Sequence, residues 1–71
     1  MGQMSAEARQ ESIVDEVLVN GRVSVTALAE RHSVTVETIR RDLTALDRRG
    51  ALRKVHGGAV GPSARTALSE A

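Results

Sequence analysis

Residues 34–50 read VTVETIRRDLTALDRRG, and their aliphatic side chains recur at helical intervals. Four of them, separated by three, four and three positions, fall on one stripe of an α-helix. These four residues are Val36, Ile39, Leu43 and Leu46. Thr35 can cap the start of the helix, and Gly50 supplies the left-handed backbone that often follows a helix end. The pattern predicts an amphipathic helix over residues 36–49.

Opposite this apolar stripe lie the side chains that would face a partner. They are Glu37, Arg41, Thr44 and Arg48, with Thr38 and Arg40 on the two flanks. Arginine can donate two hydrogen bonds to guanine, glutamate can accept one from cytosine, and threonine can contact a phosphate or a thymine methyl group. Free N–H groups at the helix N-terminus also favour phosphate. An ordinary solvated helix would carry charges on this side too, so the pattern alone leaves both interpretations open.

A longer helix is predicted near the start of the chain, over residues 5–20. Its aliphatic residues fall at helical spacing with polar residues between them, and they are Ile13, Val14, Val17 and Leu18. Ser5 is a suitable N-cap, and Gly21 follows the last residue as a helix stop.

A shorter helix is predicted between the two, with Ser24 as its cap and Arg31 at its end. Leu28 and Ala29 form its buried side. Residues 22–24 are long enough only for a short strand or an extended link, and residues 32–34 break the helical pattern. The second and third helices are therefore joined by a turn of about three residues, as in a helix-turn-helix.

After Gly50 the periodicity changes from helical to extended. Two basic residues stand between apolar ones in residues 52–55, and a Gly57-Gly58 pair precedes Ala59-Val60. Two short extended runs around two glycines predict a β-hairpin over residues 52–60. The expected fold is mainly α with a small β-hairpin, a winged helix-turn-helix of three helices plus a wing within residues 5–60.

The two ends of the chain lack this patterning. Residues 1–4 are expected to be an added leader or a disordered start, with Met4 available as a second start. Residues 61–71 are rich in Gly, Pro, Ser and Ala and are expected to be a linker or disordered tail leading to an absent effector domain. No segment reads as a membrane span or a signal peptide.

Composition limits what a chain of 71 residues can do. A domain of this size buries only about 60% of its unfolded surface, so its stability should be modest. It has no Cys and no aromatic residue, so aliphatic side chains alone must build the core. The lack of Cys suits a reducing cytoplasm and removes thiolate metal sites. Neither His32 nor His56 is accompanied by enough other ligands to form a metal site.

The net charge of +1 conceals an uneven distribution. Residues 1–30 carry two arginines and five acidic residues, whereas residues 31–56 carry seven basic and three acidic residues. A basic second half indicates a surface that could meet a polyanion. A solvated helix surface remains the alternative on charge alone.

The run from Val34 to Leu43 resembles the recognition-helix signature of the DeoR family of bacterial repressors. Arg9, Ile13 and Val17 stand where that family has one basic and two aliphatic residues, and residues 52–60 are similar to its wing. The resemblance covers Arg9 to Val60. It implies an N-terminal DNA-binding domain followed by a larger domain that binds sugar phosphates and drives oligomerisation.

Two positions depart from the family pattern. His32 stands where the family usually has an apolar, often aromatic, residue. Ser33 stands where Gly, Asn or Asp is common, in a turn that can require a left-handed backbone. Both predict a looser turn, and neither lies within the recognition signature.

The functional prediction is sequence-specific binding of double-stranded operator DNA, with no catalytic, cofactor or metal site. The expected DNA contacts are Ser24, Thr26, Thr35, Val36, Glu37, Thr38, Arg40, Arg41, Arg53, Lys54, His56 and Gly57. Asp42 is expected to be structural, pairing with an arginine. The isolated domain is expected to be a cytoplasmic, nucleoid-associated monomer, and the full-length protein a homo-oligomer. The alternative is a winged-helix module used for protein–protein contact.

Overall fold

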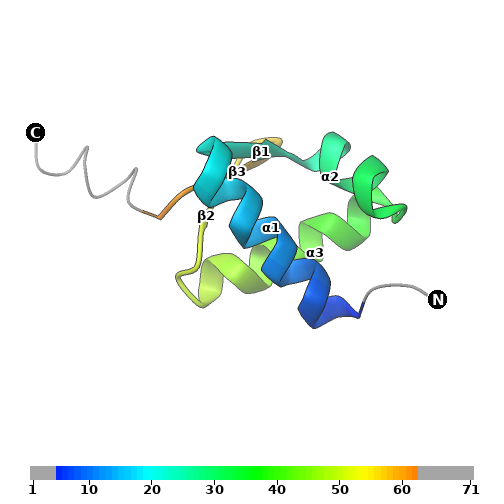
Figure 1. Ribbon diagram of the computed structural model, residues 1–71, viewed down its shortest axis with the longest axis horizontal. Coiled ribbons are helices and arrows are strands. Elements are labelled where there is room, and N and C mark those ends of the chain that lie inside the picture. Colours follow the sequence, from blue (N-terminus) through cyan, green and yellow to red (C-terminus); the bar gives the residue numbers. More distant parts are fainter. Residues whose placement is uncertain (1–4, 63–71) are drawn as a thin grey trace, which may run out of the picture.

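A computed structural model describes residues 5–62, which form three helices and a three-stranded sheet (Figure 1). In chain order the elements are α1 (Ala6–Asn20), β1 (Arg22–Ser24), α2 (Val25–His32), α3 (Val36–Arg48), β2 (Arg53–Val55) and β3 (Gly58–Val60). The predicted winged helix-turn-helix is confirmed. The expectations for residues 1–4 and 63–71 lie outside the described residues. Within the described part, no helix has the length and apolar character to cross a membrane.

Each helix begins at a hydroxyl cap that the sequence predicts. The caps Ser5, Ser24 and Thr35 accept hydrogen bonds from the backbone N–H groups of Ala8, Ala27 and Thr38 at 3.1, 3.2 and 3.1 Å. These bonds satisfy N–H groups that the first helical turn leaves without partners. At its other end α3 stops at Arg48, one residue earlier than predicted, because Arg49 and Gly50 form a turn.

The turn between α2 and α3 contains an unusual backbone conformation at Ser33. Its φ of 56° and ψ of 44° lie in the left-handed region, and it is the one non-glycine residue with positive φ in the described part of the chain. The left-handed backbone expected for this position is confirmed, and the looser turn stays a prediction. α2 extends to His32, one residue beyond the predicted end, before the chain reverses through residues 33–35 into α3.

The wing hairpin is part of a larger sheet than predicted. Its strand order is β1-β3-β2, and both pairs are antiparallel, with Ala59 opposite Val23 on one side and Lys54 on the other. Residues 22–24, predicted to be a short strand or an extended link, form an outer strand of this sheet. At Gly58 a Cβ atom would lie 1.9 Å from the carbonyl oxygen of Val23, so this pairing requires glycine there.

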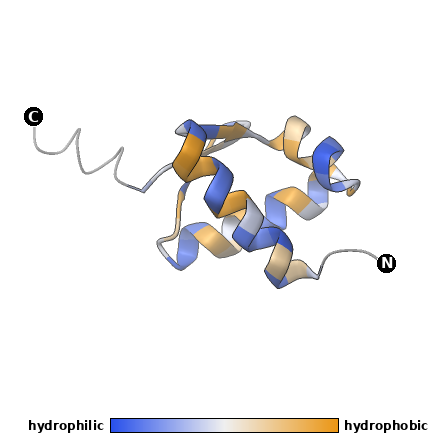
Figure 2. Ribbon diagram, in the orientation of Figure 1, coloured by the Kyte–Doolittle hydropathy of each residue, from blue (hydrophilic) through white to orange (hydrophobic). Residues whose placement is uncertain are grey.

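The core is entirely aliphatic and joins all three helices to the wing. Figure 2 shows apolar and polar segments alternating along each helix, as amphipathic packing requires. The buried apolar residues are Ile13, Val17, Val25, Leu28, Ala29, Ile39, Leu43, Leu46, Leu52 and Ala59. The predicted stripe of α3 is confirmed at its three buried positions, while Val36 is partly buried against the same core. This packing fixes which side of α3 remains outside.

Candidate nucleic-acid interface

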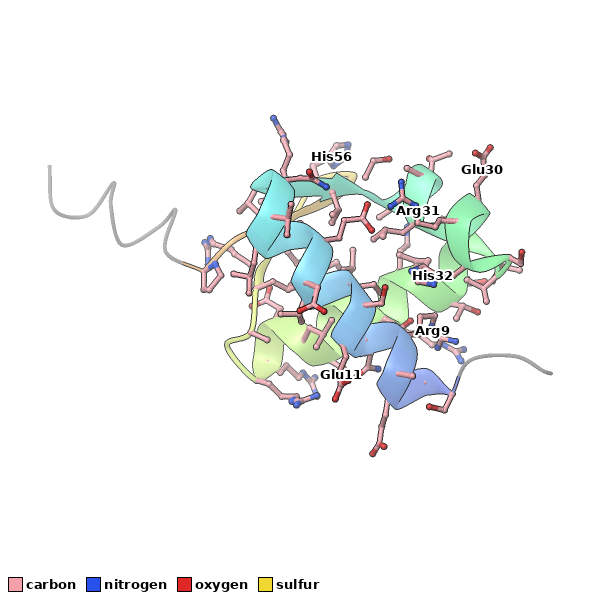
Figure 3. All side chains as sticks on the ribbon, in the orientation of Figure 1. Arg9, Glu11, Glu30, Arg31, His32 and His56 are labelled. Carbon is pink, nitrogen blue, oxygen red and sulfur yellow. The ribbon has the colours of Figure 1, made fainter. Side chains whose placement is uncertain are left out.

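The inner side of α3 carries one buried carboxylate, that of Asp42, which is 4% exposed. It accepts hydrogen bonds from Nε and Nη2 of Arg9 and from Nε2 of Gln10, the last at 3.0 Å. The hydrogen bond to Asp42 raises the pKa of the Arg9 guanidinium, outweighing the opposing effect of burial, and Coulombic attraction adds to the rise. The predicted structural role of Asp42 is confirmed, and its partner comes from α1 (Figure 3).

This cluster, which we call the α1–α3 joint, consists of Arg9, Gln10 and Asp42. It connects residues that are 32 and 33 positions apart in the chain. Directional hydrogen bonds at this point resist rotation of α3 about its own axis, which apolar packing alone restrains less strictly. The joint therefore helps to determine which side chains of α3 point outward.

The outer side of α3 carries three exposed arginines, which are Arg40, Arg41 and Arg48. Within residues 5–62, ion pairs closer than 4 Å join Arg9 to Asp42 and Arg31 to Glu16, and none includes these three arginines. A shallow groove of about 460 Å³ runs along this side. It is lined by Glu37, Arg40, Arg41, Thr44, Ala45 and Arg48. The outer side of α3 is thus a concentration of positive charge with a hollow along it.

The first turn of α3 brings together four of the predicted contact residues. Thr35 and Glu37 are exposed, whereas Val36 and Thr38 are half-buried. The hydroxyl groups of Thr35 and Thr38 lie 3.0 Å apart, so both belong to the N-terminal cap. Val36 was predicted both for the apolar stripe and for the contact surface, and its partial burial places it at the boundary between them.

The tip of the wing lies beside the start of α2. The backbone N–H of Val25 donates to the carbonyl of Gly57 at 2.9 Å, and a hollow of about 400 Å³ lies beside this contact, lined by β1 and the wing. Its lining residues are Arg22, Val23, Ser24, Val55, His56, Gly57 and Gly58. Ser24, Thr26, His56 and Gly57 are all exposed, as their predicted role requires. The side chain of His56 is visible near β1 in Figure 3.

Two neighbouring features were missed in the sequence. Arg22 is exposed at the hollow beside the wing tip, but its place there depends on the pairing of β1 with β3. Thr44 was placed on the outer side of α3 without a contact role, yet its hydroxyl accepts a hydrogen bond from Lys54 Nζ at 3.0 Å. Lys54 is exposed and Arg53 half-buried, so Lys54 is the residue of the pair that the alternation of β2 sends outward.

The acidic residues of α1 gather on a different surface, beside the end of α3. A groove of about 510 Å³ between α1 and the end of α3 is lined by Glu7, Gln10, Glu11, Val14, Asp15, Leu46, Arg49 and Ala51. Glu11 projects from α1 on this side in Figure 3. Acidic residues therefore predominate in the groove beside α1 and basic residues in the groove along α3, as the sequence distribution suggested. In the part of the chain that the structure describes, no group of three His, Cys, Asp or Glu side chains could hold a metal ion.

Comparison with known proteins shows which family the domain resembles. Residues 9–65 match the profile of the DeoR-like helix-turn-helix domain. The chain is 48% identical over 52 residues to an L-fucose operon activator of Haemophilus influenzae, covering 73% of this chain and 21% of that protein. It is 43% identical to a lactose phosphotransferase system repressor of Streptococcus mutans, covering 79% and 22% of the two chains. No solved structure matches.

A glycerol-3-phosphate regulon repressor of Escherichia coli is 40% identical over 60 residues, which are 84% of this chain and 24% of that protein. The chain thus spans between a fifth and a quarter of the length of these relatives. The matched region contains α2, α3 and the wing complete, together with α1 from Arg9 onward. The chain belongs to the DeoR family and contains the helix-turn-helix DNA-binding domain of a bacterial transcriptional regulator of that type.

Proposed function

We propose that this domain binds operator DNA sequence-specifically, with α3 in the major groove, and that the full-length regulator acts as a repressor. One observation carries the proposal: within residues 5–62 the exposed arginines of α3 have no acidic partner within 4 Å, whereas Arg9 does. Unpaired cations on one helix face repel each other, and a polyanion relieves that repulsion. The role is binding rather than catalysis, and a DNA target places the protein in the cytoplasm at the nucleoid.

Within this proposal α3 enters the groove with its N-terminus first. The residues assigned to base edges are Val36, Glu37, Thr38 and Arg41. The residues assigned to the DNA backbone are Ser24, Thr26, Thr35 and Arg40, with Arg53, Lys54, His56 and Gly57 of the wing on phosphate or in the minor groove. Exposure supports most of these roles, and the half-buried Val36, Thr38 and Arg53 would contribute through their outer atoms.

The remaining functions of a full-length regulator are assigned to the part that this chain does not cover. Relatives named for fucose, lactose and glycerol 3-phosphate systems suggest a sugar or sugar-phosphate effector. We propose that the effector and the oligomeric contacts belong to a C-terminal domain. The helix-turn-helix domain alone then binds DNA as a monomer, more weakly than a linked pair of such domains on two half-sites. Adding a sugar phosphate should leave its DNA affinity unchanged in a titration of labelled duplex.

Selection of bound duplexes from a random library tests the central proposal. A recurrent half-site should emerge, and its affinity should fall steeply with salt because counterions are released from the phosphates. Selected duplexes without a common motif, bound no better than scrambled DNA, would contradict sequence-specific reading. A complete lack of DNA binding at low salt would favour the protein–protein alternative.

A further inference from the structure

The hydroxyl group of Thr44 makes two hydrogen bonds that fix its orientation. It donates to the backbone carbonyl of Arg40 at 2.9 Å and accepts from the ammonium group of Lys54 at 3.0 Å. A hydroxyl has one proton to donate, so the bond to the carbonyl leaves its lone pairs directed toward the lysine. The polarised hydroxyl is a better acceptor than an isolated one. Thr44 is therefore an oriented hydrogen-bond acceptor for the ammonium group of Lys54.

Lys54 is attached to α3 at a second point through its backbone. Its N–H donates to Oδ2 of Asp47 at 3.1 Å, on the free edge of β2. Two attachments, one at the main chain and one at the tip of the side chain, restrict a side chain that would otherwise have several rotatable bonds. The ammonium group consequently lies along α3 and not at the tip of the wing.

This position aligns Lys54 with two arginines. Arg40 precedes Thr44 by four residues and Arg48 follows it by four, so these positions form a continuous line that runs from one flank of α3 to the middle of its outer side. Four residues of α-helix rise about 6 Å, so positions 40, 44 and 48 are spaced by roughly that distance along the axis, and the ammonium group of Lys54 lies at the middle one. The side chains of Arg40, Arg48 and Lys54 are exposed. We call this row the cation edge.

We propose that the cation edge binds consecutive phosphates of one DNA strand, and that Thr44 is the positioning residue that holds Lys54 in the row. This inference rests on the proposed DNA-binding function and extends it to Thr44 and Arg48. The ammonium group has three donors, and the bond to Thr44 leaves two for a phosphate. Lys54 thus belongs to the wing by its backbone, while its ammonium group adds to the contact surface of α3.

A double-mutant cycle on the selected operator duplex tests this role. Thr44→Val removes the hydroxyl but keeps the branched shape, and Lys54→Ala removes the cation. We expect Lys54→Ala to weaken binding about fivefold and Thr44→Val about threefold. In the Lys54→Ala background, Thr44→Val should cause no further loss, because the threonine acts through the lysine.

Two further variants provide the controls. Thr44→Ser keeps the hydroxyl group and should bind within about twofold of the parent. Arg48→Ala should lower the slope of log K against log salt by about 0.9, as loss of one phosphate contact requires, and Lys54→Ala should do the same. Thermal unfolding checks that every variant keeps the fold. We expect that each does, because Thr44, Arg48 and Lys54 lie at least partly on the surface.

Independent effects of Thr44→Val and Lys54→Ala, multiplying in the double variant, would overturn the positioning role. An unchanged salt slope in Arg48→Ala would remove Arg48 from the cation edge. These failures differ from a failure of the proposed function, since they are measured on a duplex that the parent domain binds specifically. If the parent domain showed no specific binding, the proposed function itself would fail first.

Discussion

Arg41 and Asp42 are neighbours in the chain, yet they belong to two very different environments. Asp42 points inward and is neutralised by Arg9 and Gln10, whereas Arg41 is exposed with no ion pair within the described residues. The inner side of α3 pairs its one buried charge within the protein, whereas the outer side leaves the charges of its arginines without an acidic partner within the described residues. The comparison shows that the role of a charge on this helix is determined by whether the fold supplies its counter-charge.

The largest expected effect comes from breaking the α1–α3 joint. Asp42→Ala leaves the guanidinium of Arg9 without its partner, and removal of one member of a buried pair costs about 3 kcal/mol of unfolding free energy. Denaturant unfolding measures this change. Arg41→Ala, the matched control on the outer side, should change stability by less than about 0.5 kcal/mol.

A double replacement sharpens the same test. Arg9→Met combined with Asp42→Leu replaces the buried pair by apolar side chains and should recover much of the lost stability. Equal destabilisation by Asp42→Ala and Arg41→Ala would mean that the two sides of α3 do not differ as described.

The next effect concerns specific recognition by the outer side. Arg41→Ala should cost about 1–3 kcal/mol of binding free energy on the selected operator and little on scrambled DNA, because a base-edge contact is lost. Binding isotherms on both duplexes measure the difference. An equal loss on both would show that Arg41 contacts the backbone and that α3 is rotated from the proposed orientation.

Arg40 should have a smaller and non-specific effect. Arg40 lies one turn before Thr44, on the flank of α3 assigned to the phosphates. Arg40→Ala should therefore weaken binding to the operator and to scrambled DNA alike. The slope of log K against log salt should fall by about one. Titrations at several salt concentrations supply the slope, and a loss confined to the operator would instead assign Arg40 to base reading.

His32, the last residue of α2, has an inward polar atom that the fold does not satisfy, and it gives the smallest expected change. Its Nε2 atom is buried with no hydrogen-bond partner among the described residues. His32→Leu should raise stability by about 1 kcal/mol through apolar burial, provided that the leucine fits without overpacking. His56→Leu, at an exposed position, should leave the melting temperature unchanged. A lower melting temperature for His32→Leu would show that the imidazole is stabilising where it stands.

Local features of this fold were readable from the sequence because their causes are local. Ser5, Ser24 and Thr35 cap helices through partners three residues away, and the stripe of α3 follows from its period. Asp42 could be assigned a structural role because it lies about 60° from that stripe. Its actual partner, 33 residues away, is set by how α1 crosses α3, and no spacing within the chain encodes that crossing.

The missed parts of the candidate site have the same cause. Residues 22–24 are too few for their pattern to reveal a strand, and their partner β3 is more than 30 residues away in the chain. The contact of Lys54 with Thr44 depends on the angle between the wing and α3, which the hairpin pattern does not contain. Exposure of Arg40 and Arg41 followed from the sequence, but their distinct roles do not follow from exposure.

The α1–α3 joint also bears on how such a domain can change over generations. Its three side chains orient α3 from the inner side, and Arg9 and Asp42 are largely buried. If α3 reads bases as proposed, substitutions at exposed positions such as Glu37 or Arg41 would alter the preferred base sequence without disturbing the α1–α3 joint. A gene duplicate could acquire a new operator through a few such replacements while its product still folds. Because of the joint, the fold can stay the same in descendants of the gene while the preferred operator sequence changes.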